Sequence, residues 1–150
     1  MATDLVLAIL HHLLVFVLFA LLAAELALVR LGLAGNALAR LAGIDRAYGG
    51  LAMMVIIVGV ARVIWGAKGW EYSVGNPYFW AKMAAFTAVG LLSIKPTMTI
   101  IVWRKAVTVD AAYRVPNADI AAVRRTIHLQ AGGFLLIITF AAVMARGMGY

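Results

Sequence analysis

Residues 5–29 read LVLAILHHLLVFVLFALLAAELALV, an apolar stretch long enough to cross a lipid bilayer as one helix. The stretch is too long for the core of a signal peptide and has no basic segment before it, so we expect a retained transmembrane helix. His11, His12 and Glu25 interrupt it. Ionisable side chains are costly inside a membrane and usually face the protein interior, so these three residues point to a functional site.

The composition extends this interpretation to the whole chain. With 65% hydrophobic residues and a mean hydropathy of +1.00, the chain of 150 residues belongs to the membrane class. We expect one transmembrane domain over residues 1–150, an all-α four-helix bundle with up-down-up-down topology and short loops. Its spans are expected at about residues 5–29, 49–66, 78–103 and 120–144. The absence of cysteine excludes disulfides, thiolate nucleophiles and iron–sulfur ligation.

Basic residues are distributed unequally between the two sides of the expected membrane. The connections after the first and third spans carry eight Lys or Arg residues, and the other side carries two close to span ends. The positive-inside rule therefore places these connections in the cytoplasm and both termini outside. The expected location is the bacterial cytoplasmic (inner) membrane, with lipid as the surrounding partner. Topology accounts for the net charge of +7, so no nucleic-acid partner is expected.

Local signals mark the ends of the expected helices. A connection with several Gly, Ala and Arg residues is expected up to Tyr48, and a turn-rich loop over residues 66–77. Asn76-Pro77 is a start signal for the third helix, and Pro96 should kink or loosen that helix. Asn117 is the expected cap of the last helix.

The ionisable residues inside the spans fall into two layers when they are sorted by depth. The outer layer contains His11, His12, Arg62 and Lys82, and the inner layer contains Glu25, Lys95 and His128. At 1.5 Å per residue, His11 and Glu25 are about 21 Å apart along the helix axis, so the layers are separate. We expect no carboxylate in the outer layer, because Asp4 is more superficial. A bound ligand would then supply the compensating negative charge.

Both histidines of the outer layer have an argument for facing inward, and the sequence does not choose between them. Adjacent residues of a helix point about 100° apart, so His11 and His12 cannot chelate one metal ion together, and a zinc site is weakly supported. Arg62 and Lys82 lie on faces that also carry small residues, which fits a packed interior. Each also lies near the interface, where snorkelling is the alternative.

The inner layer allows simpler interpretations. An ion pair of Glu25 with Arg46 or Lys95 at the interface is at least as plausible as catalysis. His128 lies close to two arginines near the start of its span, so interfacial solvation accounts for it better than a buried role.

Three short motifs carry a resemblance to a known group of proteins. They are ILHH at residues 9–12, DRAYG at residues 45–49 and FWAKM at residues 79–83. With the four-span layout, these motifs resemble the superfamily of small four-helix bacterial membrane proteins that contains HemJ-type protoporphyrinogen oxidases and CopD-like proteins. The similarity is closer to a family in that group described only as predicted membrane proteins of unknown function.

The resemblance implies a haem b held in the bundle by a histidine of the first span. It makes His11 or His12 the axial ligand and places Lys82 near the haem or a porphyrin substrate. The oxidases tend to carry another histidine about three turns after that lysine, where this chain reads SIK at residues 93–95. Their last helix tends to open with an Arg, Asn, Glu and Pro pattern, where this chain reads RTIHL at residues 125–129. These departures concern porphyrinogen oxidation more than haem binding.

The leading hypothesis is a haem-b-binding inner-membrane oxidoreductase, in which Arg62 and Lys82 pair with propionates or act on a porphyrin or quinone-type small molecule. The alternative is a small transporter or channel that moves protons or anions through buried His, Glu, Lys and Arg side chains. A structural or assembly subunit is a third class. Four short helices rarely shield several charges alone, so a homo-oligomer is also expected.

Overall fold

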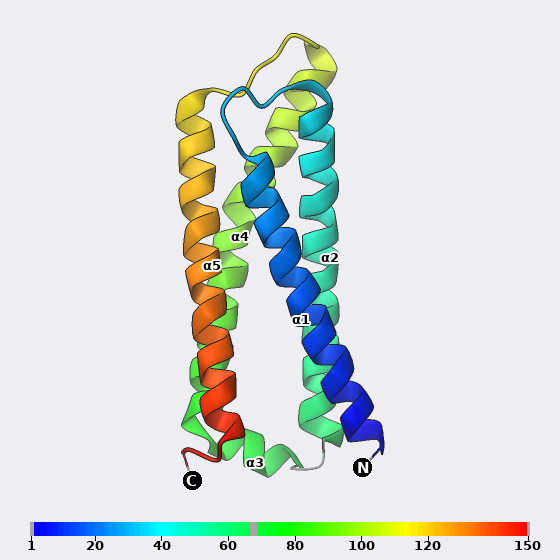
Figure 1. The fold of residues 1–150 in the computed structure, drawn as a ribbon, viewed down its shortest axis with the longest axis vertical. Coiled ribbons are helices and arrows are strands. Elements are labelled where there is room, and N and C mark those ends of the chain that lie inside the picture. Colours follow the sequence, from blue (N-terminus) through cyan, green and yellow to red (C-terminus); the bar gives the residue numbers. More distant parts are fainter. Residues whose placement is uncertain (1, 67–68, 150) are drawn as a thin grey trace.

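The computed structural model describes residues 2–66 and 69–149 and is all-helical apart from loops. The helices are α1 (Ala2–Leu28), α2 (Gly35–Trp65), α3 (Gly69–Gly75), α4 (Pro77–Val109) and α5 (Asn117–Ala145). Four of them, α1, α2, α4 and α5, are long and run alternately up and down in one bundle (Figure 1). The all-α four-helix bundle expected from the sequence is confirmed.

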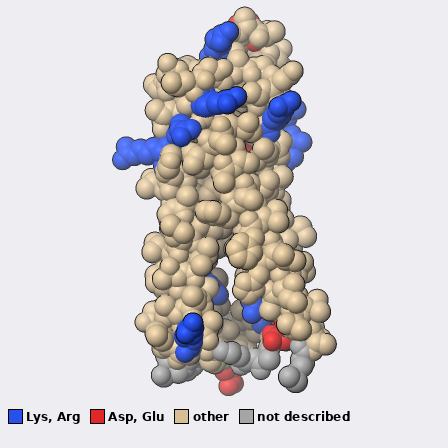
Figure 2. Space-filling view, viewed as in Figure 1, with Lys and Arg blue, Asp and Glu red and all other residues tan. Residues whose placement is uncertain are grey.

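The four long helices meet the requirements for crossing a membrane. They contain 27, 31, 33 and 29 residues, and mean hydropathy in their most apolar windows reaches 2.8, 2.0, 1.6 and 1.9. A span needs about 20 apolar residues, so each helix can extend beyond the hydrocarbon layer or tilt within it. The middle of the molecule shows an uncharged surface, while Lys and Arg gather toward the ends (Figure 2). The chain is therefore a four-helix membrane bundle.

The two ends of the bundle differ in what they contain. The α1–α2 and α4–α5 connections lie together at one end, here called the basic end because its flanking helix turns and loops carry Arg30, Arg40, Arg104, Lys105, Arg114, Arg124 and Arg125. Both termini and α3 lie at the other end, here called the terminal end (Figure 1). The sequence-based topology places the basic end in the cytoplasm.

Helix α2 is longer than the expected span. It begins at Gly35, so the segment before Tyr48, expected as a connection, is helical. The cause is a buried stripe at helical spacing, formed by Leu38, Leu41, Asp45 and Tyr48. The turn-rich segment before α4 likewise contains the short helix α3.

The expected helix signals met different outcomes. Asn76 caps α4 as predicted, since its side chain accepts a 2.9 Å hydrogen bond from the backbone N–H of Tyr78. Helix α4 continues without interruption through Pro96, which is buried. The prediction for α5 was wrong: Pro116 occupies the cap position and makes no side-chain hydrogen bond, and Asn117 is the first helical residue. Proline suits the start of a helix because its missing N–H would have no intrahelical partner there and its φ is already fixed.

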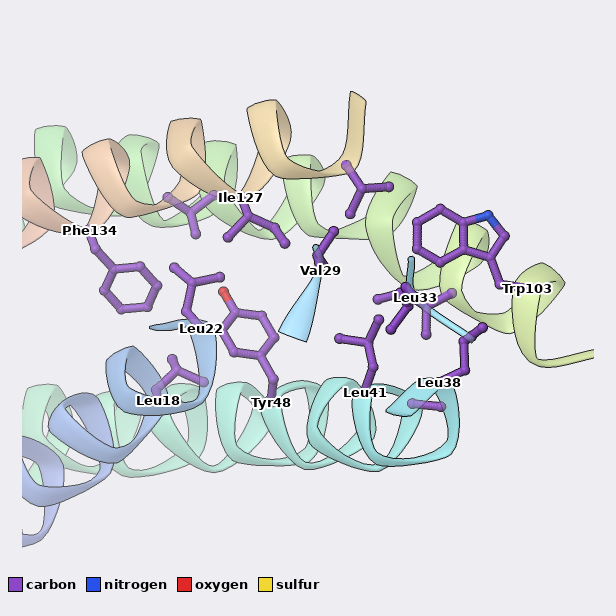
Figure 3. Close-up of a cluster of buried hydrophobic side chains, with 14 of the residues drawn as sticks. Leu18, Leu22, Val29, Leu33, Leu38, Leu41, Tyr48, Trp103, Ile127 and Phe134 are labelled. Carbon is purple, nitrogen blue, oxygen red and sulfur yellow. The ribbon is translucent and has the colours of Figure 1, made fainter. Parts of the chain in front are cut away.

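One apolar core runs along the bundle and is shown in part in Figure 3. Leu18, Leu22 and Phe134 fill its middle, and Leu41 and Trp103 fill it toward the basic end; all five are at most 2% exposed. The outward faces of the helices also carry large apolar side chains, as expected where lipid takes the place of water.

Three backbone carbonyls near the end of α1 are joined to the last part of the chain. The backbone N–H of Val115 donates to the carbonyl of Leu33 at 3.1 Å. Arg124 Nη1 donates to the carbonyls of Leu26 at 3.0 Å and Val29 at 2.7 Å. The last carbonyls of a helix have no intrahelical donor. The guanidinium of Arg124 in α5 provides donors for two such carbonyls at the end of α1.

Candidate functional site

A cavity of about 520 Å³ lies among the helices in the half of the bundle nearer the terminal end. Its wall is formed by residues of all four long helices, namely His11 of α1, Val55, Ile56, Gly59, Val60, Arg62 and Val63 of α2, Phe79, Lys82, Met83, Phe86, Thr87, Gly90 and Leu91 of α4, and Ile137 of α5. Most of this wall is apolar. Figure 2 shows the molecule hollowed in this half, with basic side chains inside the opening.

The imidazole of His11 enters the cavity wall because Gly59 leaves room for it. A Cβ atom added to Gly59 would lie 3.3 Å from Cε1 of His11, tighter than an ordinary contact. Glycine in a membrane helix permits this close approach of α1 to α2. Gly59 therefore positions His11.

Two buried nitrogens in this layer have no hydrogen-bond partner within the described part of the chain. They are Nδ1 of His11 and Nε of Arg62. Lys82 lies within electrostatic range of both residues, and its Nζ lies 5.2 Å from the centre of the Phe79 ring. A cation over an aromatic face gains modest stabilisation, but it does not neutralise the charge. Unpaired polar groups in an apolar cavity are costly unless a ligand satisfies them.

A second cavity, of about 310 Å³, is also lined by Arg62 and Lys82 and lies closer to the terminal end than the first. His12 and Asp4 contribute to its wall. The expectation that no carboxylate reaches this layer was wrong: α1 begins at Ala2, and Asp4 in its first turn packs close to the start of the α2–α3 connection. The charged groups that line this cavity are therefore two cations and one carboxylate.

The two adjacent histidines have different surroundings. His11 is half-buried and lines the larger cavity, whereas His12 is exposed and lines the smaller one. Nδ1 of His12 lies 2.6 Å from the carbonyl oxygen of Ala8, so this nitrogen carries the proton and donates along its own helix. The ring centres are 6.4 Å apart and the rings are nearly perpendicular.

The inner polar layer has a different composition from the one expected. Glu25 is 2% exposed, and its Oε1 has no hydrogen-bond partner among the described residues. The expected ion pair of Glu25 with Arg46 or Lys95 is absent from the described part of the chain. Glu25 instead lies within electrostatic range of Asp45 and Tyr48, both buried on α2.

Hydrogen bonds within this layer connect α2 to the two later long helices. Thr97 Oγ1 donates to Asp45 Oδ1 at 2.7 Å. The Tyr48 hydroxyl donates to Gln130 Oε1 at 3.3 Å, and Gln130 is 1% exposed. With Glu25 from α1, every long helix contributes to the layer. Sequence reasoning did not assign Asp45, Tyr48, Thr97 or Gln130 to this layer, although the DRAYG motif contains the first two. Gln130 continues the buried spacing of Ile120, Val123 and Ile127 on α5.

Two residues at the depth of the inner layer lie on the outside of the bundle, which corrects the buried position expected for Lys95 and agrees with the solvated position preferred for His128. Lys95 is exposed next to the buried Pro96, and His128 is exposed next to the buried Ile127. Nδ1 of His128 lies 2.8 Å from the carbonyl oxygen of Arg124, within its own helix. Neither residue contributes to the interior, because each occupies the helix face opposite the core.

The fold and the polar layers define the class as a small four-helix membrane protein with an interior cavity. The chain belongs to the family described as "Predicted membrane protein (DUF2214)", whose model matches residues 3–149. No curated protein and no solved structure matches the chain.

Proposed function

We propose that the chain is a haem-b-binding redox protein of the bacterial inner membrane, with His11 as the axial ligand. The observation that supports this proposal is the cavity of about 520 Å³ in which an imidazole and two cations meet amid apolar walls. Ligand sites are typically cavities of about 300–1,000 Å³ with mostly apolar linings and a few placed polar groups.

The residues present fit the chemistry of this cofactor. A neutral imidazole is the usual protein ligand of haem iron, and the imidazole of His11 lines the larger cavity. Arg62 and Lys82 provide charge-assisted hydrogen bonds for two carboxylates, and Arg62 also has an unpartnered buried nitrogen. Bound haem would supply one-electron redox chemistry.

The remaining roles fall to this chain's own side chains. The apolar residues Met83, Phe86 and Ile137 exclude water from the cavity around His11. In this proposal, Arg62 and Lys82 also face the smaller cavity, where a porphyrin or quinone-type molecule approaches from the terminal end. In that case the two cations hold the anionic or carbonyl oxygens of that molecule instead of the haem carboxylates.

The test is an absorbance spectrum of the full chain purified in detergent, before and after reduction with dithionite. The proposal expects a Soret band and reduced bands that disappear in His11→Ala and persist in His12→Ala. A colourless preparation that also fails to take up added haemin would overturn it.

A second candidate, proton or anion movement, is favoured by the presence of polar groups from several helices at two depths of the core. Leu18, Leu22 and Phe134 fill the core between the two layers, so this function requires the apolar barrier to open. Flux through liposomes containing the protein, compared with the Glu25→Gln variant, tests it. Equal flux in protein-free liposomes would exclude it.

A further inference from the structure

A third hollow, of about 590 Å³, lies between α2 and α4 near the basic end and overlaps neither of the two cavities described above. Its rim is formed by Arg46, Gly49 and Gly50 of α2 and by Ile101, Arg104 and Lys105 of α4. All six of these rim residues are exposed, whereas the floor at Ala42 and Ile100 is buried. We call this hollow the α2–α4 groove.

The charge of the α2–α4 groove is mainly positive. Arg46, Arg104 and Lys105 form no ion pair within residues 2–66 and 69–149. The single carboxylate, Asp45, is buried at the floor and already accepts a hydrogen bond from Thr97 at 2.7 Å. The groove therefore offers unpaired cations to an anion that approaches from outside.

The shape of the α2–α4 groove suits a hydrocarbon chain below the cations. Gly49 and Gly50 leave α2 without side chains there, and a Cβ atom on either would meet nothing within 4 Å. Ile101 supplies an apolar wall on the opposite helix. A molecule with an anionic head and an apolar tail fits this arrangement, with its head at the cations and its tail over the two glycines.

We propose that the α2–α4 groove binds one anionic phospholipid, with its phosphate held by Arg46, Arg104 and Lys105 and an acyl chain lying over Gly49 and Gly50. Basic pockets between membrane helices on the cytoplasmic side are suited to acidic headgroups. Arginine also gives bidentate hydrogen bonds to phosphate oxygens. This inference does not depend on the proposed haem site.

The test measures lipid retention by native mass spectrometry of the full chain. The protein is purified in detergent and exposed to vesicles of phosphatidylglycerol or of phosphatidylcholine. We expect one phosphatidylglycerol to remain bound and phosphatidylcholine to be lost. Each of Arg46→Gln, Arg104→Gln and Lys105→Gln should weaken phosphatidylglycerol binding by about fivefold, the effect of one basic residue near an acidic membrane surface.

Two further variants distinguish binding in the groove from non-specific attraction of acidic lipid to the basic end. Arg125→Gln removes a charge of the same end that lies outside the groove, so it should leave binding unchanged. Gly50→Leu fills the groove without changing the charge, and it should abolish retention.

Three outcomes would overturn the inference: equal retention of the two lipids, a loss in Arg125→Gln as large as in Arg104→Gln, or full retention in Gly50→Leu. If Gly50→Leu instead converts an oligomer into a monomer, the groove is an interface between copies of this chain and the lipid assignment is wrong.

Discussion

The outer and inner polar layers differ in how their side chains are satisfied. In the outer layer, His11, Arg62 and Lys82 border a cavity, and two of their buried nitrogens have no hydrogen-bond partner in the described structure. In the inner layer, hydrogen bonds from Tyr48 and to Asp45 join α2 to the two later long helices, while the buried Oε1 of Glu25 has no partner among the described residues. The outer layer therefore combines an interior cavity with an imidazole and two cations that a ligand could use, whereas the hydrogen bonds of the inner layer hold helices together.

The largest expected effect concerns the assignment of the two layers to sides of the membrane. A cysteine at Ala112, in the exposed α4–α5 connection, should not react with an impermeant thiol reagent in intact cells, whereas a cysteine at Glu71 in α3 should react fully. Both sites are exposed, and the natural chain contains no cysteine to confuse the result. The reverse labelling pattern would invert the names of the layers.

The next effect separates the two histidines. His11→Ala should remove nearly all bound haem, because the imidazole in the wall of the larger cavity is lost. His12→Ala should retain it, because the His12 Nδ1 is held by its own helix and its ring is exposed. Haem content per protein, measured after purification, distinguishes the variants. Equal haem content in both would contradict the assignment of the ligand.

A smaller effect is expected for Lys82→Met, which keeps the length and apolar stem of the side chain. The loss of one charged hydrogen bond, about 1.5–3 kcal/mol, corresponds to a weakening of haem binding by about tenfold or more. Lys95→Met is the matched control, since Lys95 is on the same helix and is exposed. Haemin titration of the apoprotein measures both. Unchanged affinity in Lys82→Met would indicate that this lysine serves no ligand.

The inner layer should respond through stability alone. Tyr48→Phe leaves Gln130 Oε1 buried without its donor, at a cost of about 1–3 kcal/mol. The double variant Tyr48→Phe, Gln130→Leu removes both partners and should recover most of that loss. Thermal unfolding in one detergent, with haem content measured in parallel, tests this. A loss of haem from a folded Tyr48→Phe variant would show that the two layers are not separate.

The smallest effect is expected for Glu25→Gln. Glu25 has no cationic partner in the described chain and lies near Asp45. A glutamine amide, which has two donors, should therefore be tolerated or should raise the free energy of unfolding by about 1 kcal/mol. Glu25→Ala is the control, since it leaves a cavity and should destabilise the bundle. A marked loss of stability in Glu25→Gln would reveal a favourable interaction of the carboxylate.

The sequence predicts the spans well because apolar runs of this length rarely form anything except membrane helices. It also brings His11, Arg62 and Lys82 to one depth, since depth follows from counting residues along each helix. The small residues beside Arg62 and Lys82 also indicate that these faces lie in a packed interior. These predictions require only helix length and a few close contacts.

The sequence does not predict which side of each helix faces the core. Lipid is as apolar as the protein core, so a membrane helix is apolar on all sides and its buried face is weakly marked. Lys95 and His128 have the depth of the inner layer but face outward. The sequence pattern predicts a connection at Asp45 and Tyr48, because Arg40 and nearby glycines interrupt the apolar run.

The contacts of Arg124 and Val115 have a consequence for biogenesis. A membrane protein is synthesised and inserted from its first helix to its last, yet the carbonyls of Leu26, Val29 and Leu33 receive their donors from residues near and within α5. A nascent chain that has delivered only α1 and α2 keeps these acceptors open at the membrane surface. The first hairpin is thus completed by the last helix, and a chain truncated before residue 115 should be recognised as unfinished and degraded.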